Sequence, residues 1–120
     1  AEMLDTGKND GGKKYALLAM DYIEKHYGEN ELGLNSICSY LNISTSRFSA
    51  IFKSVTGETF MEALTGIRMQ KARELLENTA LKNYEIAEKV GFSDPHYFSA
   101  AFKKATGKSP TEYAREKRGM

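Results

Sequence analysis

The sequence predicts an all-α protein built from two similar helical modules joined by a long linker helix. Three observations support this prediction. Apolar residues recur at helical spacing along most of the chain, no segment shows the alternation of apolar and polar residues that a β-hairpin needs, and one segment occurs in two similar copies. The chain of 120 residues is long enough for one small domain or two packed subdomains, and about seven helices fit within it.

The composition excludes several classes of protein. Charged residues make up 28% and aromatic residues 11% of the chain, which is typical of a folded soluble protein. No run reaches the roughly 18 apolar residues of a membrane span, and the N-terminus lacks the pattern of a signal peptide, so we expect a cytoplasmic protein without membrane contact. One cysteine and two histidines provide neither an internal disulfide nor a zinc site, and we expect no metal and no cofactor.

The first helix is expected to follow a linker. Residues 1–12 are polar and contain three glycines, a composition that buries too little apolar area to order itself. We therefore expect a flexible linker there, or a remnant attached to the domain, with a sensing domain preceding it. From Lys13 the spacing becomes helical and predicts a helix that ends at about Tyr27. The residues expected on its inward face are Tyr15, Leu18, Ala19, Tyr22 and Ile23.

Six further helices follow at short intervals. Their predicted ranges are 34–41, 45–55, 59–77, 83–90, 95–105 and 110–116. The helix over 59–77, taken as about 18 residues, has a length of about 27 Å, at about 1.5 Å per residue. It is predicted to join a first subdomain at 13–58 to a second at 78–120.

An internal repeat is the most informative feature of the sequence. Residues 48–57 and 98–107 are identical at seven of ten positions, at an offset of fifty. The likeness continues into 59–62 and 109–112. In both of these segments a hydroxyl residue is followed three positions later by a glutamate, the form of a capping box at a helix start.

Each copy has the anatomy of a helix-turn-helix unit. Residues 37–44 and 86–93, which align at an offset of forty-nine, contain a short helix and then a turn at Asn42 or Gly91, residue types that tolerate a positive φ. Because the offset rises to fifty downstream, the second copy has one extra residue in its turn. Two serines near the start of the second helix are candidate N-caps: Ser44 and Ser93.

The second helix of each copy has an apolar face and a polar face. Phe48 and Phe52, and equivalently Phe98 and Phe102, are expected to face inward. The opposite face has no acid in the first copy and only Asp94 in the second, at the helix start, where the helix dipole favours it. Small polar groups on such a face reach base edges in a major groove, while lysines contact phosphates. For one helix a solvated face is the simpler interpretation, whereas two related helices favour double-stranded DNA as the partner.

The spacing of the two copies is consistent with one duplex. Successive major grooves on one side of straight DNA lie about 34 Å apart. A linker helix of about 27 Å predicts that the two second helices enter adjacent grooves, with the DNA bending towards the protein.

Several segments resemble the DNA-binding region of the AraC/XylS family of bacterial transcription regulators: 67–68, 72–76, 84–99 and 102–113. The resemblance covers about residues 13 to 117 and implies two helix-turn-helix subdomains joined by a long helix. The sequence is most similar in style to family members that are fused to a phosphorylatable receiver domain, as in response regulators. This resemblance therefore implies a fused N-terminal receiver or sensor domain outside this chain, with RNA polymerase as a candidate partner.

The resemblance also implies which side chains touch DNA. Base-reading positions fall on Ser46, Arg47, Ser49, Ala50, His96, Tyr97, Ser99 and Ala100. Phosphate-contacting positions fall on Ser44, Lys53, Ser93, Lys103 and Lys104. Members commonly carry a long polar or basic side chain where this chain has Ala50 and Ala100. We therefore expect a binder that relies on thymine methyl contacts, hydroxyl groups, His96 and DNA shape rather than on two arginines.

Two other functions are alternatives to DNA binding. An enzyme is not expected, because the sequence shows no paired carboxylates, no nucleophile beside a base and no glycine-rich phosphate loop in a suitable setting. The alternative that stays open is a helical protein-interaction module that kept the core of the double motif and lost its DNA contacts.

Overall fold

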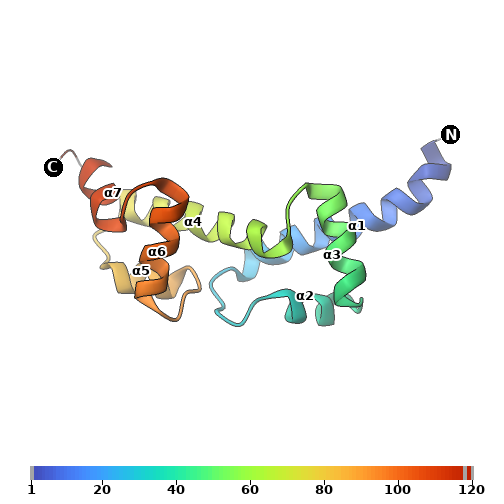
Figure 1. Ribbon diagram of the computed structural model, residues 1–120, viewed down its shortest axis with the longest axis horizontal. Helices are drawn as coiled ribbons and strands as arrows, with labels where there is room; N and C mark the ends of the chain where they lie inside the picture. Colours follow the sequence, from blue (N-terminus) through green and yellow to red (C-terminus); the bar gives the residue numbers. More distant parts are fainter. Residues whose placement is uncertain (1, 118, 120) are drawn as a thin grey trace. The chain divides into compact units, whose positions relative to one another are not determined.

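A computed structural model describes residues 2–117 and 119, with side chains from Gly12 onward. Within those residues it contains seven helices and no strand, which confirms the all-α prediction (Figure 1). The helices are α1 (Glu2–His26), α2 (Leu34–Leu41), α3 (Thr45–Thr56), α4 (Phe60–Asn78), α5 (Asn83–Lys89), α6 (Pro95–Thr106) and α7 (Pro110–Lys117).

The start of α1 differs most from the sequence prediction. The helix begins at Glu2 and not near Lys13, so residues expected to form a flexible linker have a helical backbone. Glycine costs about 1 kcal/mol relative to alanine inside a helix but still donates its backbone N–H, and no proline interrupts the segment. Ala1 lies outside the described residues. A role of this segment in joining the domain to a preceding one stays a prediction.

The chain divides into two compact units. The first contains Ala1–His26 and Glu31–Thr65, and the second contains Tyr27–Asn30 and Gly66–Met120. The division falls within α4, so the predicted linker helix contributes its first turns to one unit and its remainder to the other. In addition, a short segment between α1 and α2 belongs to the second unit although both helices belong to the first.

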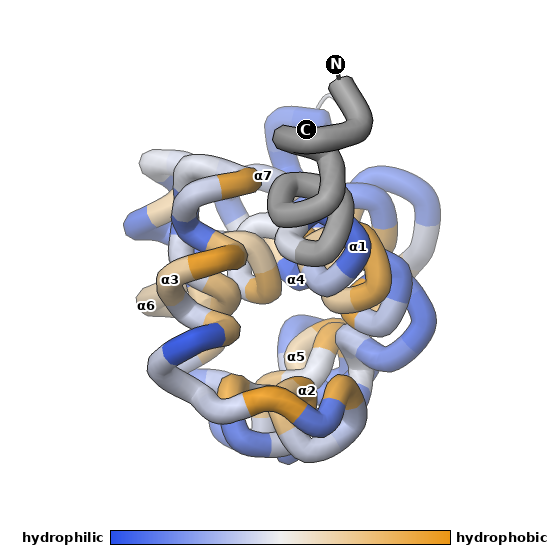
Figure 2. Tube along the Cα trace, turned by 90° about the vertical axis from the view of Figure 1, so that its right-hand side faces the viewer, coloured by the Kyte–Doolittle hydropathy of each residue, from blue (hydrophilic) through white to orange (hydrophobic). Residues whose placement is uncertain are grey.

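The first unit is held together by packing of α1, α2 and the start of α4 around α3 (Figure 1). Phe48 and Phe52 are fully buried, as predicted, and their rings lie 5.8 Å from that of Phe60 on α4. Rings at this spacing bury a large apolar area and interact favourably edge to face. Along α2 and α3, hydrophobic positions are interspersed with hydrophilic ones, as expected for helices with one buried face (Figure 2).

The buried face of α1 matches the predicted face in part: Ile23 and Ala19 are fully buried, as predicted, and the two tyrosines are half-buried. Ala16 and Ala19 are buried, whereas Leu18, expected inside, is 39% exposed. A Cβ atom added to Gly12 would lie 3.3 Å from Cγ2 of Ile51 on α3, so α3 approaches α1 closely along this line. The prediction for Leu18 is wrong because small side chains, and not large ones, mark the helix face that permits the closest approach.

The core of the second unit combines the later part of α4 with α5, α6 and α7. Phe98 and Phe102 are fully buried, as predicted, and Tyr113 of α7 packs edge-on against Phe102 at 5.4 Å. The other buried core residues are Met69, Ala72, Leu76, Ile86, Ala87, Val90 and Phe92. The second module thus reproduces the phenylalanine pair of the first.

The connections after α3 and α6 have the same hydrogen bonds. The hydroxyl of Thr56 donates to Phe52 O at 2.8 Å, and that of Thr106 donates to Phe102 O at 2.8 Å. Each threonine precedes a glycine with a positive φ, 84° and 85°, which ends the helix. The predicted capping boxes follow, confirmed by the bonds Thr59 N–H to Glu62 and Ser109 N–H to Glu112, both 2.8 Å. The repeat in the sequence is therefore a repeat of helix-ending and helix-starting bonds.

Candidate nucleic-acid interface

The turn of the first module contains a residue in the left-handed conformation and a serine that caps α3. Asn42 has a φ of 58°, and the N–H of Ile43 donates to Cys38 O at 3.1 Å. Ser44 is extended, and its hydroxyl accepts the N–H of Arg47 at 3.3 Å. This bond confirms Ser44 as the N-cap of α3 and leaves the hydroxyl at the exposed start of the helix.

The turn of the second module has a different cap from the predicted one. Gly91 has a φ of 96°, and the N–H of Phe92 donates to Ala87 O at 2.8 Å. The cap of α6 is Asp94, whose Oδ1 accepts the N–H of His96 at 2.9 Å. The prediction of Ser93 as the cap is wrong because the extra residue in this copy moves the helix start by one position. A carboxylate there also satisfies the positive end of the helix dipole.

The predicted contact residues lie together on the open face of each second helix. On α3 the residues at 46, 49, 50 and 53 follow the i, i+3, i+4, i+7 spacing of one face. On α6 those at 96, 99, 100 and 103 do the same. The exposed residues are Ser44, Ser46, Arg47, Ser49, Ala50, Lys53, Ser93, His96, Tyr97, Ala100, Lys103 and Lys104, while Ser99 is half-buried. Within each unit the structure therefore brings the predicted set to one surface.

Tyr97 is an exposed large hydrophobic side chain of α6, and its ring packs against a buried ring. Its exposed fraction is 65%, and its ring meets that of Phe92 edge-on at 5.6 Å. Phe92 is 8% exposed and lies under the guanidinium of Arg68, with 5.6 Å between the ring centre and Cζ. A tyrosine supported in this way loses little conformational freedom when its hydroxyl meets a partner.

Arg68 is a structural residue that the sequence analysis did not single out. It is 6% exposed, and it donates from Nε to Tyr27 O at 2.9 Å and from Nη2 to Glu29 O at 2.8 Å. Burial lowers the pKa of its guanidinium, but the group is cationic at neutral pH. The only signal in the sequence was its place in the Ile67–Arg68 pair of the family-like segment, because an arginine on a helix is usually solvated.

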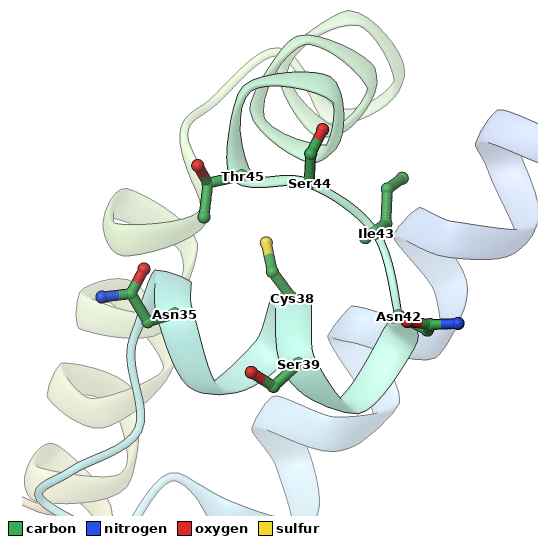
Figure 3. Close-up of a pocket in the computed structure, with 7 residues that line it drawn as sticks. All are labelled: Asn35, Cys38, Ser39, Asn42, Ile43, Ser44 and Thr45. Carbon is green, nitrogen blue, oxygen red and sulfur yellow. The ribbon is translucent and has the colours of Figure 1, made fainter.

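A polar depression of about 530 Å³ lies between α2 and the start of α3. Cys38 stands at its floor, and Ser44 and Thr45 stand at the α3 side (Figure 3). Cys38 is almost fully buried, and this burial raises the pKa of its thiol. Thr45 is exposed beside the predicted Ser44 and was missed by the sequence analysis because the second copy has Pro95 near the equivalent place.

Two of the predicted phosphate lysines, Lys53 and Lys103, each lie near a capping glutamate. The hydrogen bond from Thr59 N–H and the attraction of Lys53 lower the pKa of Glu62. In the second unit the bond from Ser109 N–H, with Lys103 nearby, lowers the pKa of Glu112. The two glutamates are therefore ionised at neutral pH and offset part of the lysine charge.

Neither a metal site nor a membrane-spanning helix occurs in the described part of the chain. No group of three or more histidine, cysteine, aspartate or glutamate side chains there is arranged to hold a metal ion. No helix among the described residues is both long enough and apolar enough to cross a bilayer.

Comparisons with known proteins agree with this architecture. Residues 37–116 match a family described as a helix-turn-helix domain. The Msm operon regulatory protein of Streptococcus mutans is 38% identical over 108 residues, which are 90% of this chain. The C-terminal domain of AraT, a response regulator from Geobacillus stearothermophilus, is 46% identical with a TM-score of 0.84, covering 85% of this chain and 84% of that one. The chain belongs to the AraC/XylS family.

A second response regulator supports the same assignment. The C-terminal domain of YesN from Fusobacterium nucleatum is 40% identical with a TM-score of 0.80, covering 81% of this chain and 94% of that one. The chain spans 38% of the length of the Streptococcus mutans regulator. As an AraC/XylS helix-turn-helix domain, it is a DNA-binding domain of the kind found in transcription regulators, which confirms the expected class of function.

Proposed function

We propose that this AraC/XylS domain binds double-stranded DNA sequence-specifically, as the output domain of a longer bacterial transcription regulator, with α3 and α6 each in a major groove. The observation that carries the proposal is the equivalence of the two helices. Each buries a phenylalanine pair and presents the same register positions to solvent. We propose that one chain places both helices on one duplex, in adjacent grooves, which predicts a footprint longer than one helical turn of DNA.

The base-reading role is assigned to the exposed faces of α3 and α6. In the first module Ser46, Arg47, Ser49 and Ala50 take this role, with Arg47 as the long donor. In the second module the residues are His96, Tyr97, Ser99 and Ala100. The support that Phe92 gives to Tyr97 favours a fixed contact by this side chain. Ala50 and Ala100 suit a thymine methyl group.

The phosphate-contacting role is assigned to the ends of the same helices. Ser44 and Ser93 lie at the starts of the helices, and Lys53, Lys103 and Lys104 lie in their last turns. The exposed hydroxyl of Thr45 joins Ser44 at the depression between α2 and α3, where free backbone amides favour a phosphate oxygen.

The rest of the regulator is proposed from the relatives. AraT and YesN are response regulators of which the matching parts are C-terminal domains. We therefore propose a receiver or sensor domain fused before this chain, a cytoplasmic location and RNA polymerase as a partner of the bound regulator. None of these roles requires an enzymatic activity of this domain. A protein-interaction module without DNA contacts is not favoured by membership of the AraC/XylS family.

Replacing Lys103 with alanine is expected to weaken binding to all duplexes by about fivefold and to reduce the slope of log affinity against log salt concentration by about one unit. Loss of one phosphate contact removes one released counterion, whatever the sequence. Fluorescence anisotropy titrations between 50 and 200 mM salt measure both effects. Lys25→Ala, which removes the same charge from an exposed position on α1, is the matched control and should leave the slope unchanged. An unchanged slope for Lys103→Ala would exclude this residue from the phosphate set.

Replacing Ala100 with arginine is expected to change the preferred sequence and to raise affinity for sites that gain a guanine by about tenfold, because arginine donates two hydrogen bonds to guanine. Selection of bound sites from random duplex DNA, followed by titration of the selected site, measures the change. Ala105→Arg on the same helix, at an exposed position outside the base-reading set, should retain the original preference. If Ala100→Arg selected the same sites as the parent chain, position 100 would not face the bases.

A further inference from the structure

The first helix carries two leucines on the side that faces away from the core of its unit. Ala16, Ala19 and Ile23 of α1 are buried, whereas Leu17 is 60% exposed and Leu18 is 39% exposed. On a helix, positions 17 and 18 lie opposite the line of positions 16, 19 and 23. The leucine pair therefore leaves apolar surface in water on the outward face of α1.

Charged residues flank the leucine pair symmetrically. Lys14 lies three positions before Leu17, and Asp21 lies three positions after Leu18, so all four follow one stripe of the helix. The four side chains, together with Lys13, line a shallow and mainly apolar depression of about 440 Å³. Along this stripe the order is base, leucine, leucine, acid. Read in the opposite direction, the order is acid, leucine, leucine, base.

We propose that this outward face of α1 docks the same face of a second copy of the chain, with the two helices antiparallel. In that register Leu17 of each copy lies against Leu18 of the other, and Lys14 of each copy faces Asp21 of the other. The contact is self-complementary about a two-fold axis, which is the arrangement that closes a dimer. Asp21, which forms an exposed ion pair with Lys25 at 3.0 Å within its own helix, lies within the charged rim of the contact.

The charge pattern selects a second copy over other occupants. A preceding domain of the regulator or an unrelated partner would need an apolar patch but no particular order of charges along α1. The order found here suits an antiparallel copy of itself and would place like charges together in a parallel pair. The contact uses neither α3 nor α6, so it is independent of the proposed DNA binding.

Sedimentation equilibrium of the 120-residue chain tests the proposal. Four leucines form a small interface, so we expect reversible dimerisation that becomes visible only at high micromolar concentrations. The double variant Leu17→Ala/Leu18→Ala should be monomeric throughout, and it should fold normally because both side chains are exposed and alanine favours helix. Circular dichroism confirms the fold of each variant.

Charge exchange tests the antiparallel register. Lys14→Glu and Asp21→Lys should each weaken self-association by about tenfold, because each creates two like-charge contacts in its own dimer. An equimolar mixture of these two variants should regain association, since the mixed dimer again has opposite charges at both contacts. The double variant Lys14→Glu/Asp21→Lys should regain it alone. Lys89→Glu, at an exposed position on α5, makes the same charge change away from the stripe and should have no effect.

Three results would overturn the proposal. A chain that stays monomeric up to millimolar concentration would mean that the leucine pair does not bind a second copy but contacts another partner, such as a preceding domain of the regulator. Association that survives the loss of both leucines would place the interface elsewhere. Failure of the mixed charge variants to associate would exclude the antiparallel register.

Discussion

Replacing Gly91 with alanine is expected to destabilise the second unit by about 4 kcal/mol. Two costs combine at this position. The φ of 96° lies in a region that side-chain-bearing residues rarely adopt, and an added Cβ would lie 2.3 Å from Tyr27 O and 2.7 Å from Nε of Arg68. Backbone oxygen atoms within a packed segment cannot move away cheaply, so the turn before α6 must distort. Urea denaturation followed by circular dichroism measures the loss in the free energy of unfolding.

Gly107 provides the matched control for this substitution. Its φ of 85° is similar, but no atom lies within 4 Å of an added Cβ. Gly107→Ala therefore carries the conformational cost alone, about 1 kcal/mol. Equal losses for the two variants would mean that close contact with Tyr27 and Arg68 does not limit position 91.

Replacing Arg68 with methionine is expected to cost about 3 kcal/mol of the free energy of unfolding. Methionine keeps most of the side-chain volume, but it removes the two donors to Tyr27 O and Glu29 O and the charge above the ring of Phe92. Hydrogen bonds from a charged donor contribute about 1.5 to 3 kcal/mol each, and part of this is recovered by solvent. The same urea denaturation experiment measures the loss.

Arg115, exposed on α7, provides the control, because the same arginine-to-methionine substitution there removes no buried hydrogen bond. Arg115→Met should alter stability by no more than about 0.5 kcal/mol. A loss of that small size for Arg68→Met would show that the buried hydrogen bonds contribute little. Because an added Cβ at position 91 would also crowd Arg68, the Gly91→Ala loss should be smaller in the Arg68→Met background, a coupling that a double-mutant cycle detects.

Local signals in the sequence were sufficient to predict most of the fold. The ends of α2 to α7 follow from turn residues, caps and helical spacing, and the predicted ranges lie within about two residues of the observed ones. The repeat added the phenylalanine pairs and the capping boxes, because two copies that agree at the same positions identify the residues that the fold needs.

The features that the sequence did not predict depend on contacts distant along the chain. Leu18 resembles a core residue by spacing, but α1 packs through Ala16 and Ala19 because α3 comes close there. The role of Arg68 depends on carbonyl oxygens about forty residues earlier, which no helical pattern reveals. The cap of α6 was misplaced by one residue because Ser93 and Asp94 are both good caps, and only the position of the helix start decides between them.

The path of the chain between α1 and α2 limits how the domain can be dissected. Tyr27–Asn30 belongs to the second unit, although the residues on both sides of it belong to the first. A single protease cut or a simple truncation therefore cannot yield two intact units. A cut in α4 leaves Tyr27–Asn30 with the first unit, and the second unit then lacks this segment. A fragment designed to test the second module in isolation must retain this segment, or have it added as a synthetic peptide, because Arg68 donates hydrogen bonds to its carbonyl oxygens.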